Sequence, residues 1–448
     1  MFQRVLVANR GEVAVRVIRA LHELGVEAVA VYSTADEGAP YVRLADRAVR
    51  LGPAPATASY LRIPSVVAAA TTTGCDAVHP GWGFLAENPA FARACEEQGL
   101  VFVGPTPDVM ARMGDKARAK QELKAAGVPL VPGTEGAATI EQARTAASEL
   151  GYPVLLKAAA GGGGKGMRLV EAPDGLEDAF GSAASEAQAA FGDPALYVEK
   201  VIALARHVEV QVLADEDGNV LTLGERECSI QRRHQKLIEE SPSPALTPEL
   251  RESMEATAER AARAIGYRNA GTFEFLVGPD ASYYFIELNA RLQVEHPVSE
   301  MCTGIDIVRQ QLRIAAGEML NATGRALRRG HAIEVRINAE DPAHNFAPAP
   351  GIIERFRAPL GPGVRVDTAV EDGAVVPPFY DSLIAKLIVW DADRGAAIRR
   401  ALRALGELEV HGVPTTREVA LEILETEEFR SGEYSTSFLE ARFSPVAS

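Results

Sequence analysis

Cysteine is scarce in this sequence, and its few cysteines stand far apart. Four occur among 448 residues, Cys75, Cys95, Cys228 and Cys302, and no two form a CxxC pair. This spacing favours reduced thiols in a cytoplasmic protein over a disulfide framework or a zinc site. There is no run of ~18 uninterrupted apolar residues, so we expect no membrane span. The first residues lead directly into a predicted strand and lack the regions of a signal peptide.

Positive charge is also in deficit. The sequence has 46 Lys and Arg residues against 61 Asp and Glu residues, a formal net charge of −15 at pH 7. Nucleic-acid phosphates would be repelled at long range, so we expect no nucleic-acid partner. A small polyanionic ligand remains possible at a site where basic residues are concentrated. The turn from Asn9 to Glu12 has one glycine and is not a GxGxxG fingerprint, so no dinucleotide site is predicted.

The order of the predicted elements indicates an α/β fold, and the length suits two or three domains. A strand over Val5–Ala8, a helix over Glu12–Leu24 and a strand over Glu27–Tyr32 predict an N-terminal doubly wound parallel sheet. Strands at Asp76–His79 and Leu100–Val103 extend it. Each ends in a glycine-containing turn, at the carboxyl edge where such sheets bind ligands.

Further elements are predicted along the rest of the chain. Helices are expected over Pro107–Ala126, Asp174–Phe191, Pro248–Ile265 and Gly304–Gly317, and after Arg394 and Thr415. Strands are expected over Tyr152–Lys157, Met167–Val170, Tyr197–Ile202, His207–Leu213, His331–Asn338 and Ser382–Trp390.

A glycine-rich loop connects two of these strands. It contains Gly161, Gly162, Gly163 and Gly164, whose N–H groups can approach a phosphate without side chains in the way. Lys165 is followed by Gly166 and an extended segment, so the loop is not a Walker A motif. We predict a mobile phosphate-binding flap, with a flexible linker as the alternative.

The segment from Thr272 to Pro297 is predicted to form a hairpin that turns at Gly278-Pro279-Asp280. Pairing Val277 with Tyr284, Phe275 with Ile286 and Phe273 with Leu288 gives one apolar face.

The other face of this hairpin is polar. The same register sets Glu274 opposite Glu287 and Thr272 opposite Asn289, and like charges in direct opposition destabilise a hairpin. A hard divalent cation between these oxygens would remove that conflict. The alternation predicts that Arg291, Gln293 and Glu295 continue the polar face. A half-exposed strand with a solvated polar face is the alternative.

Basic residues concentrate between Glu225 and Lys236. In an acidic protein this indicates a local anion site. The alternative is that the arginines pair with Glu225, Glu227, Glu239 and Glu240.

Seven motifs follow one another along the chain: ANRGEVAVR from Ala8, HPGWGFLAEN from His79, KAAAGGGGKGM from Lys157, RHVEVQVLAD from Arg206, ECSIQRRHQK from Glu227, FIELNARLQVEHPVSEM from Phe285 and RINAEDP from Arg336. These motifs and their order resemble those of biotin carboxylases, ATP-grasp ligases that carboxylate biotin. The chain resembles this family over nearly its whole length. A biotin-bearing Met-Lys-Met sequence is absent, so it resembles the free-standing subunit of bacterial acetyl-CoA carboxylase.

The resemblance implies a domain organisation. Residues 1–114 would form the N-terminal α/β domain, 115–320 a central ATP-grasp domain with a glycine-rich lid over about 131–203, and 331–445 a C-terminal α+β domain.

The resemblance also implies site residues. ATP would be bound by Lys116, Lys157, the four flap glycines, Glu199, Lys200, Ile202, His207, Gln231 and His234, with Glu274 and Glu287. Magnesium or manganese would be bound by Glu274, Glu287 and Asn289. Bicarbonate would be surrounded by Lys236, Arg291, Gln293, Val294 and Glu295, and biotin would meet Arg336 and Trp82. Lys236, Arg291 and Glu295 would be catalytic, with Glu295 as the base for bicarbonate.

Three departures from the family pattern affect kinetic detail. Trp82 stands where tyrosine is frequent, Ala159 and Ala160 replace smaller or hydroxylated flap residues, and Lys165 replaces arginine.

The implied reaction has two steps. Bicarbonate attacks the γ-phosphate of ATP to give carboxyphosphate, and carbon dioxide from it is transferred to biotin on a biotin carboxyl carrier protein. A homodimer and carboxyltransferase subunits are the implied partners. The alternatives are service in another acyl-CoA or pyruvate carboxylase, a different ATP-grasp carboxylate ligase, and an inactive ATP-binding regulatory subunit.

Overall fold

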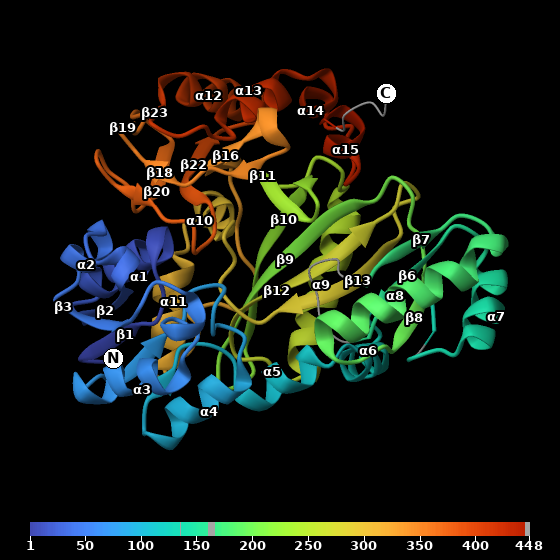
Figure 1. The fold of residues 1–448 in the computed structure, drawn as a ribbon, viewed down its shortest axis with the longest axis horizontal. Coiled ribbons are helices and arrows are strands. Elements are labelled where there is room, and N and C mark those ends of the chain that lie inside the picture. The colour runs from blue at the N-terminus through green and yellow to red at the C-terminus, as the bar shows by residue number, and fades with distance from the viewer. Residues whose placement is uncertain (135, 160–165, 444–448) are drawn as a thin grey trace.

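The N-terminal part contains a parallel five-stranded sheet, as predicted. The computed structural model describes residues 1–134, 136–159 and 166–443. The strands are ordered β3-β2-β1-β4-β5 (lower left in Figure 1). Their bounds are β1 Arg4–Val7, β2 Glu27–Ser33, β3 Arg47–Gly52, β4 Ala77–His79 and β5 Val101–Phe102.

Helices cover both faces of this sheet because its strands are apolar on both sides. On β1, Leu6 packs in the same cluster as residues of α3 (Ile63–Thr72) and α4 (Pro89–Glu97). Its neighbours Val5 and Val7 pack in another cluster with residues of α1 (Gly11–Glu23). The doubly wound arrangement is therefore confirmed.

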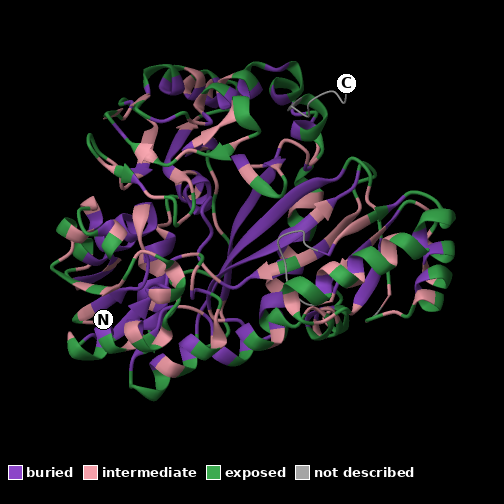
Figure 2. Ribbon diagram, in the orientation of Figure 1, coloured by how far each residue is buried: buried purple, intermediate pink, exposed green. Residues whose placement is uncertain are grey.

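A large, mostly antiparallel sheet forms the centre of the molecule, and Figure 2 shows its middle strands as buried. Its order is β13-β12-β9-β10-β11-β15-β22-β20, and β14 pairs with β10. The bounds are β9 Arg206–Ala214, β10 Val220–Arg232, β11 Gln235–Ser241, β12 Asn269–Val277, β13 Tyr283–Asn289, β14 Gly324–Arg325, β15 His331–Asn338, β20 Val364–Thr368 and β22 Leu383–Asp391. Helix α9 (Pro248–Ala264) packs against β9 and β10.

This sheet runs without interruption from the central segment into the C-terminal one. Strand β11 pairs antiparallel with β15, and their register sets Ile238 opposite Val335 and Glu239 opposite Glu334. Strand β15 then pairs with β22. The C-terminal part is therefore joined to the centre by backbone hydrogen bonds as well as by side chains.

The lid region is a separate three-stranded layer (right side of Figure 1). Its strands β7 (Arg168–Val170), β6 (Val154–Ala158) and β8 (Leu196–Lys200) are antiparallel and have a small apolar core of their own with α7 (Ile140–Leu150) and α8 (Leu176–Phe191). The predicted flap, including Gly161–Gly164 and Lys165, lies outside the described residues.

The prediction of one helix over Pro107–Ala126 is wrong in one respect, because the segment forms two helices. Helix α5 spans Pro107–Gly114 and α6 spans Lys116–Ala125. Asp115 between them is extended, with φ −84° and ψ 103°, and its side chain accepts a hydrogen bond from Arg118 N. An aspartate favours this N-cap position, which explains the break.

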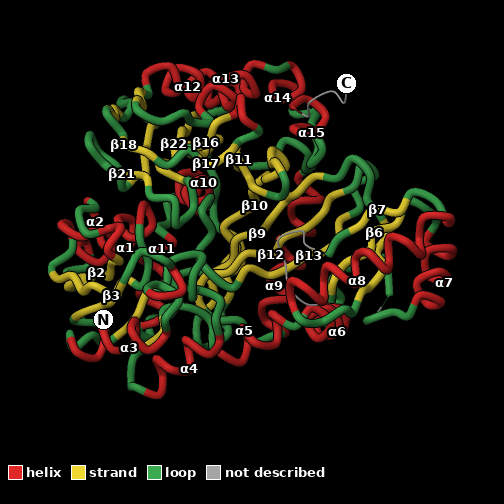
Figure 3. Tube along the Cα trace, viewed as in Figure 1, coloured by secondary structure: helices red, strands yellow, loops and turns green. Residues whose placement is uncertain are grey.

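The C-terminal part places helices over one side of the shared sheet (Figure 3). Helix α12 (Arg394–Glu407) packs on β22 and β15. The remaining elements are α2 Pro40–Leu44, α10 His296–Thr303, α11 Ile307–Ala315, α13 Arg417–Glu425, α14 Glu427–Ser431 and α15 Phe438–Phe443, with short strands β16 Glu340–Asp341, β17 Ala347–Pro348, β18 Gly351–Ile352, β19 Arg355–Arg357, β21 Val375–Val376 and β23 Glu409–His411. None of the described helices has the length and apolar character needed to cross a membrane.

Candidate active site

The polar face of the β12–β13 hairpin has the predicted register. Glu274 pairs with Glu287, and Thr272 pairs with Asn289. Glu274 is buried, whereas Glu287 is exposed. The protein groups around Glu287 still desolvate its carboxyl group in part, and this effect, followed by repulsion from Glu274, raises the pKa of Glu287. The opposed carboxylates that the sequence predicted are therefore present.

The apolar half of the same hairpin differs from the prediction. The register shifts by one residue beyond Glu274, so Phe275 pairs with Phe285 rather than Ile286, and Val277 pairs with Tyr283 rather than Tyr284. A β-bulge at this point gives Phe285 the buried position, where its ring contacts Phe275 at a centroid distance of 6.1 Å.

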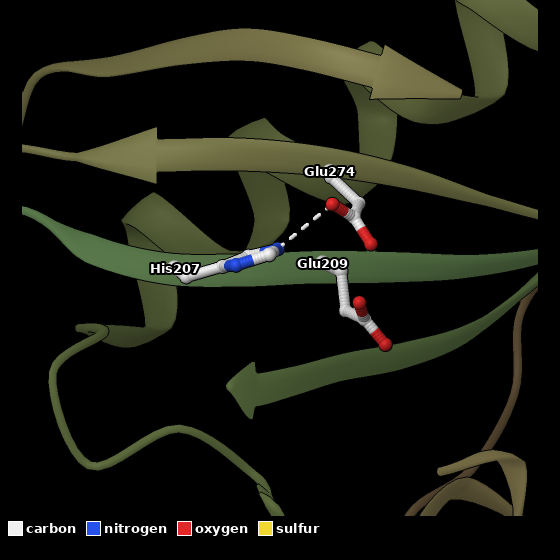
Figure 4. A group of neighbouring side chains, drawn as sticks. All are labelled: His207, Glu209 and Glu274. Carbon is white, nitrogen blue, oxygen red and sulfur yellow. Dashed lines mark ion pairs between the residues drawn. The ribbon is translucent and has the colours of Figure 1, made fainter. Parts of the chain in front are cut away.

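Lys236 is the central cation of the site. Its Nζ lies 2.6 Å from Glu209 Oε2, 3.0 Å from Glu274 Oε1 and 2.5 Å from Glu295 Oε1. His207 Nε2 lies 3.0 Å from the other oxygen of Glu274. Figure 4 shows His207 on β9 pointing toward Glu274 on β12, with Glu209 projecting from the same strand. Burial opposes ionisation of Glu274, but Lys236 and His207 outweigh it and hold its pKa far below normal.

A buried arginine supports this cluster from behind. Arg226 Nε donates to Glu209 Oε1 at 2.5 Å, and its other nitrogens donate to Gln211, Thr272 and Ser299. Both the Arg226 and the Glu209 side chains are 0% exposed. The guanidinium therefore fixes the carboxylate that faces Lys236.

Glu295 is clamped between two cations. Arg336 Nη2 donates to Glu295 Oε2 at 2.9 Å, opposite the oxygen that Lys236 contacts. Arg336 Nε also donates to Glu239 Oε1 at 2.6 Å. Burial opposes ionisation of Glu295, but Lys236, Arg336 and Arg226 hold its pKa well below normal. Glu295 is thus a carboxylate throughout the physiological range.

The chain reaches Glu295 by a path that differs from the prediction. Strand β13 ends at Asn289, and residues 290–295 form a loop and turn rather than a continued strand. Helix α10 then begins at His296 with Pro297 in its first turn, a position that proline favours and a strand does not. Turn geometry, and not strand alternation, therefore directs Glu295 toward Lys236.

Arg291 lies within this loop and is held by three side chains. Its Nε donates to Glu87 Oε2 at 2.8 Å, its Nη2 to Asn289 Oδ1 at 2.8 Å and its Nη1 to Gln293 Oε1 at 3.0 Å. The other oxygen of Glu87 accepts from Ala290 N at 2.8 Å. Beside Glu87 is a cavity of about 370 Å³ lined by Gly83, Phe84, Glu87, Asn88 and Pro89.

Trp82 and Val294 are tied to a buried lysine. Trp82 Nε1 donates to Glu12 Oε1 at 3.0 Å, and Glu12 Oε2 lies 3.2 Å from Lys386 Nζ. Lys386 also donates to the carbonyl of Val294 at 2.8 Å. These two predicted biotin- and bicarbonate-site residues are therefore connected through Glu12 and Lys386.

At the lid side, lysines surround one buried carboxylate. Lys157 Nζ lies 2.7 Å from Glu199 Oε2, and Lys120 Nζ lies 2.5 Å from Glu199 Oε1. Burial, with repulsion from Lys157 and Lys120, lowers the pKa of Lys116 despite the attraction of Glu287. Three ammonium groups near one buried carboxylate leave an excess of positive charge that suits a polyphosphate.

Gln231 and His234 line a second cavity, of about 130 Å³, whose other lining residues are Arg233, Thr436, Ser437 and Glu440. Arg233 and His234 form the β10–β11 turn with φ of 49° and 65°, a conformation that strains non-glycine residues. A two-residue hairpin turn between Arg232 and Gln235 requires positive φ at both central residues, which explains this conformation. Lys200 and Ile202 lie at and beyond the end of β8, and Lys200 N donates to Pro132 O at 2.8 Å.

The basic segment does not form one anion site. Arg226 is buried against Glu209, while Arg232 donates to Asn345 and lies over the ring of Phe346. Arg226 and Arg232 lie six residues apart on β10, roughly 20 Å along a strand, so their charges do not meet at one site. The alternative pairing was wrong as well, since Glu225 pairs with Arg251 and Arg328.

Three groups of described side chains have donors for a metal, and in one of them, Glu209, Cys228 and Glu295, both carboxylates already contact Lys236. His207, Glu209 and Glu274 offer ligand atoms within 4.8 Å of one another, but Lys236 already stands between the two carboxylates. Glu274, Glu287 and Asn289 offer only oxygens, of which those of Glu274 also contact Lys236 and His207 and that of Asn289 accepts from Arg291. Glu287 has no hydrogen-bond or ion-pair partner in the described part of the chain. Oxygen donors with an uncompensated carboxylate fit Mg²⁺ or Mn²⁺.

Three family profiles match successive parts of this chain. The profile described as "Biotin carboxylase, N-terminal domain" matches residues 1–110, "Carbamoyl-phosphate synthase L chain, ATP binding domain" matches 115–323, and "Biotin carboxylase C-terminal domain" matches 334–441. Together they span most of the sequence.

Full-length relatives agree with these profiles. A protein named Biotin carboxylase from Nostoc sp. is 52% identical over 98% of this chain and 99% of its own length. A pyruvate carboxylase subunit of Methanothermobacter thermautotrophicus is also 52% identical, over 98% of this chain and 90% of its length. The biotin carboxylase domain dimer of Hydrogenobacter thermophilus 2-oxoglutarate carboxylase, solved with MgADP, ADP and bicarbonate, has a TM-score of 0.95 and 49% identity, covering 100% of this chain and 99% of that one.

Proposed function

This chain belongs to the biotin carboxylase family, and we propose that it carboxylates biotin on a biotin carboxyl carrier protein as the first half-reaction of acetyl-CoA carboxylase. Its activity is that of an ATP-dependent biotin carboxylase, a ligase with an ATP-grasp domain. The carrier and the enzyme that it serves are the proposed part. The observation that carries the mechanism is Lys236, which joins the metal-side carboxylate Glu274 to Glu295.

ATP is proposed to lie between the lid and the central sheet. Lys116 and Lys157 would meet its phosphates, together with the flap glycines Gly161–Gly164, which lie outside the described residues. Glu199, Lys200 and Ile202 would surround adenine, and His207, Gln231 and His234 would line the rest of the nucleotide site. The second cavity at Gln231 and His234 supports this placement.

Glu274, Glu287 and Asn289 would hold Mg²⁺ or Mn²⁺. The bound ion would neutralise phosphate charge during transfer. Of these residues, Glu274 also contacts Lys236, so the proposed metal site lies next to the proposed bicarbonate site.

Bicarbonate is proposed to enter between Lys236 and Arg291, with Gln293 and Val294 beside it. It would take over the contact of Lys236, which frees Glu295 from one of its two cations and makes that carboxylate a better base. Glu295 accepts the proton while the bicarbonate oxygen bonds to the γ-phosphorus and ADP leaves, giving carboxyphosphate. Positioning and charge neutralisation account for most catalysis of this kind.

Biotin is proposed to receive the carboxyl group beside Arg291 and Arg336, near Trp82. Carboxyphosphate would break down to carbon dioxide and phosphate, the phosphate would take the proton of the ureido nitrogen, and that nitrogen would then bond to carbon dioxide. Arg291 would stabilise the enolate-like biotin anion, and its three side-chain contacts hold it ready for that role. Exclusion of water by the lid protects carboxyphosphate from hydrolysis.

The proposal also includes three domains, over residues 1–114, 115–320 and 331–445. It further includes assembly as a homodimer, a cytoplasmic location and carboxyltransferase subunits as partners. The printed titles of relatives include biotin carboxylases and pyruvate and 2-oxoglutarate carboxylases. The chain is equally similar to the Nostoc biotin carboxylase and to the Methanothermobacter pyruvate carboxylase subunit, at 52% identity each. Sequence identity therefore does not indicate which carrier protein this chain carboxylates.

A bicarbonate-dependent ATPase assay with and without free biotin tests the chemistry, and biotinylated carrier proteins test the assignment. We expect ADP release to require bicarbonate and the carrier of acetyl-CoA carboxylase to be carboxylated fastest. Faster carboxylation of the carrier domain of a pyruvate carboxylase would reassign the complex. ADP release that ignores bicarbonate would contradict the proposed mechanism.

A further inference from the structure

Lys120 contacts the same buried carboxylate as the predicted phosphate ligand Lys157. Lys120 and Lys116 are one helical turn apart on α6 and therefore share a face of that helix. Lys120 Nζ lies 2.5 Å from one oxygen of Glu199 while Lys157 Nζ lies 2.7 Å from the other. Lys120 also lies 3.9 Å above the ring centre of Tyr197, which fixes its position.

Glu199 needs a cation at all times. Its side chain is 5% exposed, and its backbone is bridged to Gly133 on one side and paired with Leu155 on the other. A buried carboxylate that loses its partner is strongly destabilised. If Lys157 alone neutralised Glu199, drawing Lys157 toward phosphates would leave a buried charge uncompensated and would oppose ATP binding.

We propose that Lys120 is a positioning residue, the permanent counter-ion of Glu199 that allows Lys157 to turn to the phosphates of ATP. Lys157 then exchanges one anionic partner for another, and Lys120 keeps the carboxylate neutralised. This inference rests on the proposed function, because it takes ATP as the ligand of Lys157.

The proposal differs from a purely structural role for Lys120. A lysine that only ties α6 to β8 would affect all ligands and the thermal midpoint alike. A lysine that releases Lys157 affects the affinity only for ligands with phosphates. Its substitution should no longer change that affinity when Glu199 is neutral.

The test measures ATP and adenosine affinity by calorimetry for Lys120→Met, Glu199→Gln and the double variant, with Arg118→Met on α6 as control. Arg118 is more than half exposed and pairs with Glu122. We expect Lys120→Met to weaken ATP binding about 10–100-fold and adenosine binding little. The double variant should bind ATP within about threefold of Glu199→Gln alone.

Three outcomes would overturn the inference. The first is an unchanged ATP affinity in Lys120→Met, and the second is an equal loss of affinity for ATP and adenosine in that variant. The third is a double variant whose loss of ATP binding free energy equals the sum of the losses in the two single variants. The ATP affinity of the wild-type protein distinguishes failure of this inference from failure of the proposed function. If the wild type binds ATP and shows bicarbonate-dependent cleavage, the function stands whatever Lys120 does.

Discussion

At the scale of single residues, the site is a row of buried charges that neutralise one another. Lys236, Arg226 and Arg336 alternate with Glu209, Glu295 and Glu239. Removing one member therefore leaves another charge uncompensated. Substitutions that keep the shape and remove the charge are the informative ones.

Glu295→Gln should lower turnover by about 10²–10⁴, because the proton acceptor for bicarbonate is lost while the side chain keeps its size. ATP affinity should hardly change, since Glu295 contacts Lys236 and Arg336 and no predicted nucleotide residue. ATP binding and bicarbonate-dependent ADP release provide the measurement.

Glu239→Gln is the matched control, because it also removes a buried carboxylate from Arg336. We expect it to lower turnover less than Glu295→Gln. If Glu295→Gln abolished ATP binding while ADP release per bound ATP stayed normal, Glu295 would be a nucleotide-site residue and not the base.

Glu240 gives a prediction about pH. Burial opposes its ionisation, but His331 and Arg394 lower its pKa from 4.5 to about 2. Because the folded pKa lies below the unfolded one, its stabilisation is complete above about pH 4.5 and disappears as the pH falls toward 2. The shift corresponds to roughly 3 kcal/mol.

Urea unfolding at a series of pH values checks this prediction. The Glu240→Gln protein should be less stable than wild type by a constant amount from pH 7 to about pH 4.5, and the difference should shrink between about pH 4.5 and 2. A difference that stays constant over this range would show that Glu240 contributes through packing and not through its charge.

At the scale of elements, sequence reasoning located the polar face of the β12–β13 hairpin but misplaced half of its register. The opposed Glu274 and Glu287 followed from alternation back from the predicted turn. The bulge left no signal, because Phe285 and Ile286 are both apolar and either one satisfies the alternating pattern. Alternation along β9 also places Glu209 on the same face as His207, but its pairing with Lys236 depends on a distant strand.

Glu287→Gln should raise the Mg²⁺ concentration for half-maximal activity by at least about 10–100-fold, since one of two opposed carboxylate ligands is lost. Titration of activity with Mg²⁺ and Mn²⁺ measures the change. Asp280→Asn, in the turn of the same hairpin, is the control and should leave the titration unchanged. Normal turnover of Glu287→Gln at ordinary magnesium would remove Glu287 from the metal site.

At the scale of the whole molecule, the motifs predicted three segments but not how these are joined. Strand β15 was predicted, yet alternation within a strand does not identify its partner, and the pairing with β11 is long-range in sequence. The network around Lys386 was also unpredicted. That lysine is fully buried and connects Glu12 of α1, the Val294 carbonyl and the C-terminal sheet.

Lys386→Met should destabilise the protein by roughly 3–5 kcal/mol, because Glu12 and the nearby Asp367 would lose their shared cation. Adding Glu12→Gln should restore part of this loss. Thermal midpoints of the single and double variants measure both effects. A double variant no more stable than Lys386→Met would indicate that the lysine acts through Val294 and Asp367 and not through Glu12.

The pairing of β11 with β15 also limits how this chain can be recombined with its relatives. A chimera that joins a foreign C-terminal segment between residues 323 and 331 would have to rebuild the ladder from Ile238 to Ser241 with new side chains. A mismatched segment would leave β11 as an exposed edge, which promotes aggregation. Carrier specificity is therefore better transplanted by exchanging surface residues than by exchanging domains.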